Sequence, residues 1–226
     1  MNFGLGLDLN LGNPSKGDIV SPPSPAQITY AGSVTGSRGS TFTNVPLGTA
    51  SLDRLVLFVT TITLTGTKAT TMTVNGNAAS LIASLGPGFV SSQIWAIKLA
   101  TATTATVVLN NTSSFGSAIH SYYTECTENI SQVLATFNSN TGSSSPVSLT
   151  ADPDSFLLVG SISNNNSNFI TLGGVDTQDF SADVNSTEFA ASAHSNNVSG
   201  LQSITATNLN GLSNVLVVAS AALTSP

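Results

Sequence analysis

Apolar residues along the chain occur in short runs or alternate with Thr and Ser, and helical periodicity is almost absent. β-branched residues dominate these runs, and such residues favour strands. Turn signals separate the runs, among them Asn75-Gly76, Gly86-Pro87-Gly88 and Asn210-Gly211. Many short strands with turns at this spacing are typical of an all-β fold, so we expect an antiparallel, jelly-roll-like β-sandwich.

The pattern places a strand on each of the longer runs. The predicted strands are Ile28–Val34, Thr41–Val45, Leu55–Leu64, Thr71–Val74, Ala79–Ser84, Ser92–Leu99, Ala105–Asn110, Ala118–Glu125, Gln132–Phe137, Val147–Thr150, Phe156–Ser161, Phe169–Leu172, Glu188–His194, Leu201–Thr207 and Asn214–Ala222.

Residues 1–26 differ from the rest of the chain. Ser21–Pro25 is a stiff, polyproline-like spacer. Before it, Leu5, Leu7, Leu9 and Leu11 alternate with Gly, Asp and Asn, which gives a period-two stripe that can pair as a strand on a sheet edge. The stripe is either the first strand of the same domain or an assembly arm that docks on a neighbouring subunit. The spacer favours an extended N-terminal arm.

Residues 27–226 contain a weak internal duplication. Similar segments recur in the same order, and they predict one sandwich of two similar halves, about 27–137 and 138–226. The short link around Asn138–Pro146 favours one sandwich over two separate ones. The matching pairs are Asp53–Leu57 with Asp154–Val159, Met72–Ala78 with Ile170–Val175, Thr104–Thr106 with Thr205–Thr207, and Ala118–Tyr123 with Val215–Ala219.

Charge is scarce, and this narrows the partners. Charged residues make up 7% of the chain, against about 25% in an average soluble domain. The net charge of −6 and the five scattered Lys and Arg residues argue against nucleic acid, which needs clustered basic residues. The longest apolar stretches, such as Val215–Ala222, are far shorter than the roughly 20 residues of a membrane-spanning helix, so no membrane insertion is expected.

Two further features bear on the compartment. Cys126 is the only cysteine, so no intrachain disulfide can form and the sheets themselves must provide stability. The opening Met-Asn-Phe-Gly lacks the basic and apolar regions of a secretory signal peptide. We therefore expect synthesis and assembly in the cytoplasm.

Motifs of known chemistry are missing from the sequence. It contains no Gly-x-Ser-x-Gly elbow and no phosphate-binding loop, so we expect a non-enzymatic protein with no catalytic residues and no cofactor. His120 and His194 fall on predicted strands, where a half-exposed polar side chain is the ordinary interpretation, and no His or Cys pair has zinc-ligand spacing.

Aspartates raise the question of calcium. Loop carboxylates at Asp176, Asp179 and Asp183 are of the kind that bind this ion. No EF-hand or nonapeptide pattern accompanies them, however, and Asp152-Pro153-Asp154 is explained by turn formation. We therefore expect no metal.

A glycan site needs an exposed aromatic ring flanked by amides. Trp95 lies in an apolar run and is expected in the core. Tyr122 and Tyr123 are adjacent on a strand, so they point to opposite faces and one is expected to face outward. Asn165 and Asn196 lie in amide-rich segments that are either solvated turns or a source of hydrogen bonds. Our candidate glycan contacts are thus Tyr122, Tyr123, Asn165 and Asn196.

Four segments resemble a known class of proteins. Phe42–Gly48, Asp53–Leu57, Met72–Ala79 and Ser92–Ile97 are similar to β-sandwich virion proteins of tailed bacteriophages. Those proteins often carry an F-x-N-V-x-[IL]-G opening followed by D-R-x-[VL]-[VL], and a V-x-[IV]-[GN]-G-x-A-A hairpin. The resemblance covers roughly residues 27–125 and, faintly, the second half, and it transfers no functional residue.

The resemblance implies a structural role in a virion, most directly as a fibre, spike or other appendage that attaches to the host surface. It also implies self-association, with a homotrimer as the common state, and contacts with other virion proteins. A host surface glycan would then be a partner. Two alternatives stay open: a capsid decoration (cement) protein, and a carbohydrate-binding module of an extracellular protein.

Overall fold

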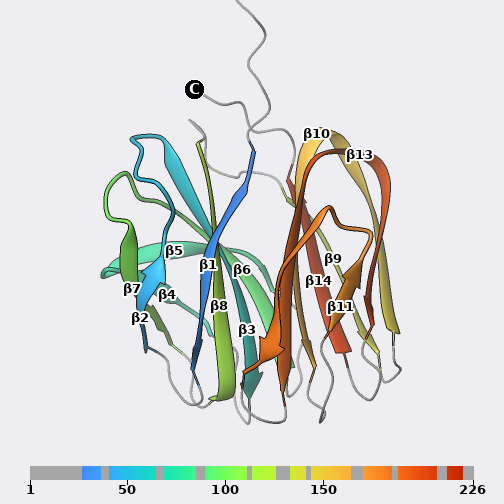
Figure 1. The fold of residues 1–226 in the computed structure, drawn as a ribbon, viewed down its shortest axis with the longest axis horizontal. Helices are drawn as coiled ribbons and strands as arrows, with labels where there is room; N and C mark the ends of the chain where they lie inside the picture. The colour runs from blue at the N-terminus through green and yellow to red at the C-terminus, as the bar shows by residue number, and fades with distance from the viewer. Residues whose placement is uncertain are drawn as a thin grey trace, which may run out of the picture.

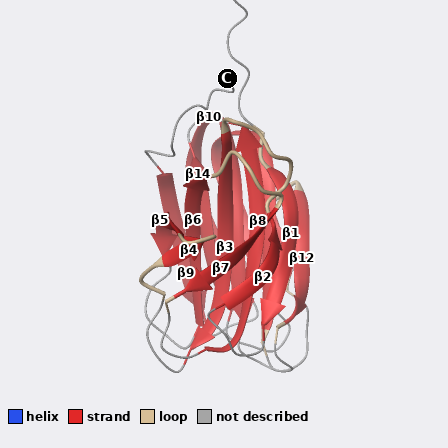
Figure 2. Ribbon diagram, turned by 90° about the vertical axis from the view of Figure 1, so that its left-hand side faces the viewer, coloured by secondary structure: helices blue, strands red, loops and turns tan. Residues whose placement is uncertain are grey.

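The structure is a computed structural model that describes residues 27–36, 41–64, 69–84, 90–110, 114–125, 133–140, 144–163, 170–184, 188–207 and 213–220. Within these ranges the chain consists of strands and loops (Figure 2). The expected all-β class and antiparallel sandwich are confirmed. No helix in these ranges is long and apolar enough to cross a membrane.

The strands follow one another in the order β1 (Thr29–Gly36), β2 (Thr41–Pro46), β3 (Arg54–Leu64), β4 (Met72–Val74), β5 (Asn77–Ser84), β6 (Val90–Lys98), β7 (Thr104–Leu109), β8 (Ser114–Glu125), β9 (Val133–Asn140), β10 (Ser144–Ser163), β11 (Thr171–Gly173), β12 (Thr177–Asp183), β13 (Phe189–Thr207) and β14 (Ser213–Ser220).

The first half of the chain, β1 to β8, forms an eight-stranded antiparallel sheet with the order β1-β8-β3-β6-β5-β4-β7-β2. The sheet curls until its end strands, β1 and β2, lie beside each other. Ser121 on β8 links these ends, because its hydroxyl lies 3.1 Å from the carbonyl oxygen of Gly32 and 2.5 Å from that of Pro46. Gly32 is required at this crossing, since a Cβ there would lie 2.5 Å from Pro46 Cγ.

The second half, β9 to β14, is built around one long folded hairpin. β10 and β13 pair with each other, and the sheet has the order β11-β13-β10-β14-β9, with β12 also paired to β13. Positive φ angles at Asp154, Asn197 and Gly200 accompany irregular pairing in the middle of the hairpin. The hairpin bends there, so Val147 before the bend and Leu157 after it pack into the same apolar cluster.

The strand pairing of the first half recurs in the second. β9 pairs with β14 as β1 pairs with β8, and the segments of β10 and β13 on either side of the bend correspond to β2, β3, β6 and β7. Leu57 on β3 lies opposite Tyr122 on β8, and Leu158 on β10 lies opposite Val218 on β14. Leu57 and Leu158 are thus equivalent positions, and so are Tyr122 and Val218.

The two halves pack face to face (Figure 1). Leu57 and Leu158 belong to the apolar cluster between the halves. Each half also encloses a cluster of its own, which contains Phe58 and Trp95 in the first half and Leu157 in the second. Successive side chains along β3 and β10 point to opposite faces. One side chain therefore packs into the cluster between the halves, and the next packs into the cluster inside its own half. Figure 2 shows the short strands β2, β4 and β7 lying across the face of the longer strands.

Most predicted strands correspond to observed ones, with three corrections. Val147–Thr150 and Phe156–Ser161 are parts of the single strand β10, and Glu188–His194 and Leu201–Thr207 belong almost entirely to β13. Asp152-Pro153-Asp154 bends β10 without ending it. β12 was not predicted, because its sequence TQDFSAD has few apolar residues. The proposed arm with Leu5, Leu7, Leu9 and Leu11 lies outside the described residues.

The segments that carry the phage resemblance contain strained turns that the fold requires. Asn44 (φ 57°) lies in the bulge of β2, and Asn75 and Gly76 (φ 49° and 81°) form the tight turn between β4 and β5. Gly48 has φ 75°, and a Cβ there would lie 2.1 Å from Tyr123 Cδ1. These segments are therefore determinants of the fold.

Gly160 on β10 controls how closely the two halves approach. A Cβ at this position would lie 2.5 Å from both Val59 Cγ1 and Ser92 Oγ across the interface. We predict that Gly160→Ala lowers the free energy of unfolding by about 1–3 kcal/mol, because overpacking a close-packed core forces neighbours to shift. Urea denaturation monitored by fluorescence measures the change.

Gly36→Ala is the matched control. Its Cβ would lie 3.3 Å from Cε1 of the Phe42 ring, so a small ring movement relieves the contact. If Gly160→Ala lowers the free energy of unfolding no more than Gly36→Ala does, the two halves do not approach each other closely at Gly160.

Candidate functional site: a polar seam between the two halves

Several ionisable groups of the interior gather at one flank of the contact between the halves. On β8, Ala118, His120 and Tyr122 are fully buried and face the second half, while the intervening Ile119 packs inside the first half. The opposing strands are β12 and β13. We call Tyr30, Tyr122, Asp179, His194 and Asn196 the polar seam.

Asp179 on β12 is the centre of the seam. The Tyr122 hydroxyl donates to its Oδ2 at 2.9 Å, and His194 Nδ1 lies 2.8 Å from the same oxygen. Because an ionised carboxylate only accepts, His194 Nδ1 carries the hydrogen in this contact. The Asp179 side chain is 3% exposed and that of His194 is 15% exposed. One carboxylate therefore ties β8 of the first half to β13 of the second.

Aromatic contacts surround this carboxylate. The ring centroids of Tyr122 and Tyr30 are 5.3 Å apart, and those of Tyr122 and His194 are 5.9 Å apart. Burial raises the pKa of Tyr122 well above its ordinary value, and the negative charge of Asp179 raises it further. Burial likewise raises the pKa of Tyr30. Both phenols thus remain protonated at neutral pH, and Tyr122 acts as a hydrogen-bond donor.

Asn196 extends the seam to the start of β1. Its Oδ1 accepts from the backbone N–H of Ile28 at 2.8 Å, and its Nδ2 donates to the Ile28 carbonyl at 3.0 Å. Next to it, Asn197 Oδ1 accepts from Gln27 Nε2 at 2.7 Å. One amide side chain thus imitates a strand partner and fixes the beginning of the first half to the bend of β13.

His120 lies deeper in the same interface. Its ring packs against Phe180 of β12 with centroids 4.6 Å apart, and Thr61 Oγ1 lies 3.5 Å from its Nε2. Complete burial lowers the pKa of His120 to about 3, because the charged imidazolium would lose its hydration there. His120 is therefore neutral at physiological pH.

Arg54 is a second buried ionisable centre, outside the seam. Its guanidinium, in a side chain with no exposed surface, donates to main-chain carbonyl oxygens of two loops. Burial lowers the pKa of the Arg54 guanidinium below its ordinary value. The five N–H donors of an arginine suit this role, because each loop presents several acceptors. The acceptors are the carbonyls of Leu47, Gly48, Thr49, Leu99, Thr101 and Ala102, at 2.7–3.4 Å.

The hydrogen bonds of the polar seam connect the two halves of the sandwich. An aspartate that orients a histidine is also part of hydrolytic triads. Here the third group is the phenol of Tyr122, which has no exposed surface and donates back to the same carboxylate. These contacts hold the halves together.

The candidate glycan contacts do not share one surface. Tyr122 is buried in the seam, and Tyr123 is half-buried beneath Gly48 on the opposite face of β8. Both hydrogen-bonding groups of the Asn196 amide are engaged with Ile28. Asn165 lies outside the described residues.

Other candidate residues also have definite places. Trp95 is buried in the core of the first half, as expected. His120 corrects the expectation of a half-exposed strand histidine, because its strand is covered by the second half. Asp176 Oδ2 accepts from the backbone N–H of Asn196 at 3.3 Å. Within the described ranges, no three His, Cys, Asp or Glu side chains lie close enough to hold a metal ion.

The sequence pattern assigns no structural role to Asp179 or Arg54. Asp179 resembles a loop aspartate, and the usable signal is the weak alternation of Gln178, Phe180 and Ala182, which indicates a strand. Arg54 resembles a surface cation, although an arginine directly before a long apolar run has few ways to reach solvent. Neither partner of Asp179 is near it in sequence, so the cluster itself could not be foreseen.

Comparison with known proteins adds little. No known protein family and no curated protein matches this chain. Among solved structures, the chain is similar to a conserved protein of unknown function from Pseudomonas aeruginosa PAO1, with 10% identity and a TM-score of 0.29. The match covers 87% of this chain and 83% of that one.

We predict that Tyr122→Phe lowers the free energy of unfolding by about 1.5–3 kcal/mol, because it removes a buried hydrogen bond to a charged group. Tyr123→Phe is the adjacent control and should change it by less than about 0.5 kcal/mol. A double-mutant cycle with Asp179→Asn should give a coupling energy of at least about 1 kcal/mol. Additive effects would show that the two side chains do not interact.

We predict that His120 makes the fold sensitive to acid. The unfolded chain takes up a proton at His120 below pH 6.5, whereas the folded protein does so only near pH 3. Stability is therefore highest above pH 6.5 and falls as the pH drops to 3, by about 1.4 kcal/mol per pH unit from this residue.

Measurement of unfolding free energies from pH 7 to pH 4 tests this, with His120→Phe as the comparison because the ring already packs against Phe180. The plot of unfolding free energy against pH should be shallower for His120→Phe than for the parent. The difference in slope should correspond to the uptake of up to one proton on unfolding, which is about 1.4 kcal/mol per pH unit. Parallel slopes for the two proteins would contradict burial of a neutral His120.

Proposed function

We propose that this chain is a non-enzymatic virion structural protein of a tailed bacteriophage, acting as a fibre, spike or other appendage in attachment to the host. The observation that carries the proposal is the position of the resembling segments. Phe42–Gly48 and Met72–Ala79 supply the bulge and turn of the first half, and Asp53–Leu57 supplies Arg54 and the start of the central strand. The resemblance therefore rests on residues that determine a fold.

The use of the ionisable groups supports a structural role. Arg54 fixes two loops, and Asp179 joins Tyr122 to His194 across the halves. His120 is buried and neutral. Arg54 and Asp179 thus contribute to the stability of the sandwich, which suits a protein that has to remain folded in an external assembly.

Self-association is part of the proposal. With 7% charged residues, strand edges and faces have few of the charges that usually keep β proteins apart. The arm with Leu5, Leu7, Leu9 and Leu11 is the proposed link to a neighbouring subunit, as an added strand. A homotrimer is the state that the family resemblance implies.

The capsid decoration protein is the second candidate, and copy number separates it from an appendage. In purified particles we expect the chain at far lower abundance than the major capsid protein, as measured by gel densitometry, with antibody labelling confined to the tail or its fibres. Abundance close to that of the major capsid protein, with label over the whole shell, would favour decoration. Absence from particles, with retention on a polysaccharide column, would favour the carbohydrate-binding module.

The assembly arm is tested in the same particles. Deletion of residues 1–25 should leave the β core folded, as measured by circular dichroism, and abolish incorporation into particles. A variant with Leu5, Leu7, Leu9 and Leu11 changed to Ser is the matched control for chain length and should fail in the same way. Normal incorporation of both variants would refute the arm.

A further inference from the structure

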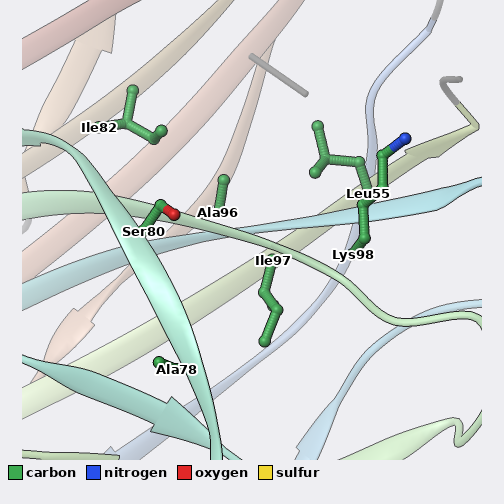
Figure 3. Close-up of a pocket in the computed structure, with 7 residues that line it drawn as sticks. All are labelled: Leu55, Ala78, Ser80, Ile82, Ala96, Ile97 and Lys98. Atoms are coloured by element: carbon green, nitrogen blue, oxygen red, sulfur yellow. The ribbon is translucent and has the colours of Figure 1, made fainter. Parts of the chain in front are cut away.

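A second flank of the contact between the halves contains a cavity. Its volume is about 220 Å³, and among the described residues it is lined by side chains from β3, β5 and β6 (Figure 3). Leu55, Ile82 and Ala96 belong to or pack against the apolar cluster between the halves. The remaining lining residues are Ala78, Ser80, Ile97 and Lys98.

The internal repeat relates this cavity to the polar seam. Ser80 pairs with Ala96, and Thr177 pairs with His194. Each ladder then has a bulge two residues later, at Ile82 on β5 and at Asp179 on β12. Ile82 is therefore the equivalent of Asp179, and Ala96 is the equivalent of His194. The cavity is lined by the same positions that form the seam.

What differs is the type of residue at the equivalent positions of the neighbouring strands. In the seam, β8 presents Tyr122, whose ring packs beside His194 and whose hydroxyl reaches Asp179. The register equivalent of Tyr122 in the second half is residue 218, which is a valine, and the equivalent of Tyr30 is residue 135, an alanine. Two aromatic residues are thus replaced by small aliphatic ones.

We propose that the cavity lined by Leu55, Ile82 and Ala96 binds a single aromatic ring. The equivalent space in the seam holds the ring of Tyr122, so the fold accommodates a ring at this place. Isoleucine and alanine stand at the positions that aspartate and histidine occupy in the seam. A cavity of about 150 Å³ is enough to take up benzene, and this partly open cavity, with Ser80 and Lys98 among its lining residues, is larger.

Two polar residues line the cavity, and they indicate that a ligand can carry a polar group. Ser80 is exposed, and Lys98, also exposed, takes the position that Asn196 has in the seam. A ring with one polar substituent therefore fits as well as a plain hydrocarbon. Such a ring belongs either to a free small aromatic compound or to the side chain of another polypeptide.

Titration of the full chain with toluene, p-cresol and N-acetylphenylalanine amide tests the proposal. Methyl-resolved NMR should show saturable shifts at Ala78, Ile82 and Ala96 with at least one of the free aromatics, and the melting temperature should rise with ligand concentration. Comparable binding of N-acetylphenylalanine amide would identify a side chain of a partner as the source of the ring. Binding of toluene or p-cresol alone would identify a free small molecule.

Ala78→Trp should weaken binding at least tenfold, because Ala78 lines the cavity and is exposed enough to accept a larger side chain. Ala50→Trp, at an exposed position outside the cavity, is the matched control and should bind as the parent does. If Ala78→Trp fails to fold, Ser80→Phe replaces it. Absence of shifts at the cavity with all three probes, or equal binding by the blocked variant, would overturn the proposal.

Discussion

The close packing of one sheet face from each half against the other is the constraint on which the rest of this structure depends. Gly160 leaves no room for a side chain between β10 and the strands that carry Val59 and Ser92. Leu57 and Leu158 on these faces pack into the apolar cluster between the halves, whereas Tyr122 and His194 hydrogen-bond to Asp179 at the flank. Where this close packing ends, the polar seam around Asp179 lies at one flank of the interface and the cavity lies at the other.

The two flanks differ although the halves share their strand pairing. Both halves have the same strand pairing and the same bulge, so each flank brings together equivalent positions. An aspartate at the bulge requires donors, and Tyr122 and His194 supply them. The isoleucine at the equivalent position, Ile82, packs against the apolar cluster between the halves. Different residues at equivalent positions thus accompany one flank closed by hydrogen bonds and one flank with a cavity.

Much of the fold could be predicted from the sequence, because short β-branched runs and turn residues are local signals. Asn75-Gly76 is a clear case, since its tight turn needs nothing from the rest of the chain. The errors came where tertiary contacts decide. β12 is polar, and pairing to β13 is what makes it a strand. Asp152-Pro153-Asp154 was interpreted as a turn, yet the pairing of β10 and β13 continues on both sides of it.

The candidate site was less predictable for the same reason. Tyr122 was placed on a strand correctly, but the alternation rule cannot say which face of a strand a second sheet will cover. His120 and Tyr122 point the same way, and that face meets the second half of the chain. Asn196 was interpreted as a surface amide, whereas its partner, Ile28, is 168 residues away. Contacts over such separations leave no local trace in sequence.

The few charges of this chain have an unusual distribution, and that distribution connects the fold to the proposed role. Arg54 and Asp179 are both inside, where each is satisfied by hydrogen bonds from or to well-defined partners. Of the five basic residues, at most four remain for the surface, so the outer faces are even poorer in positive charge than the composition indicates. The remaining charge is mainly acidic and thinly spread, because only 7% of the residues are charged. Contacts with neighbouring subunits would then depend on shape, hydroxyl groups and strand edges, which is the kind of interface that a permanent assembly can use and a freely diffusing enzyme does not need.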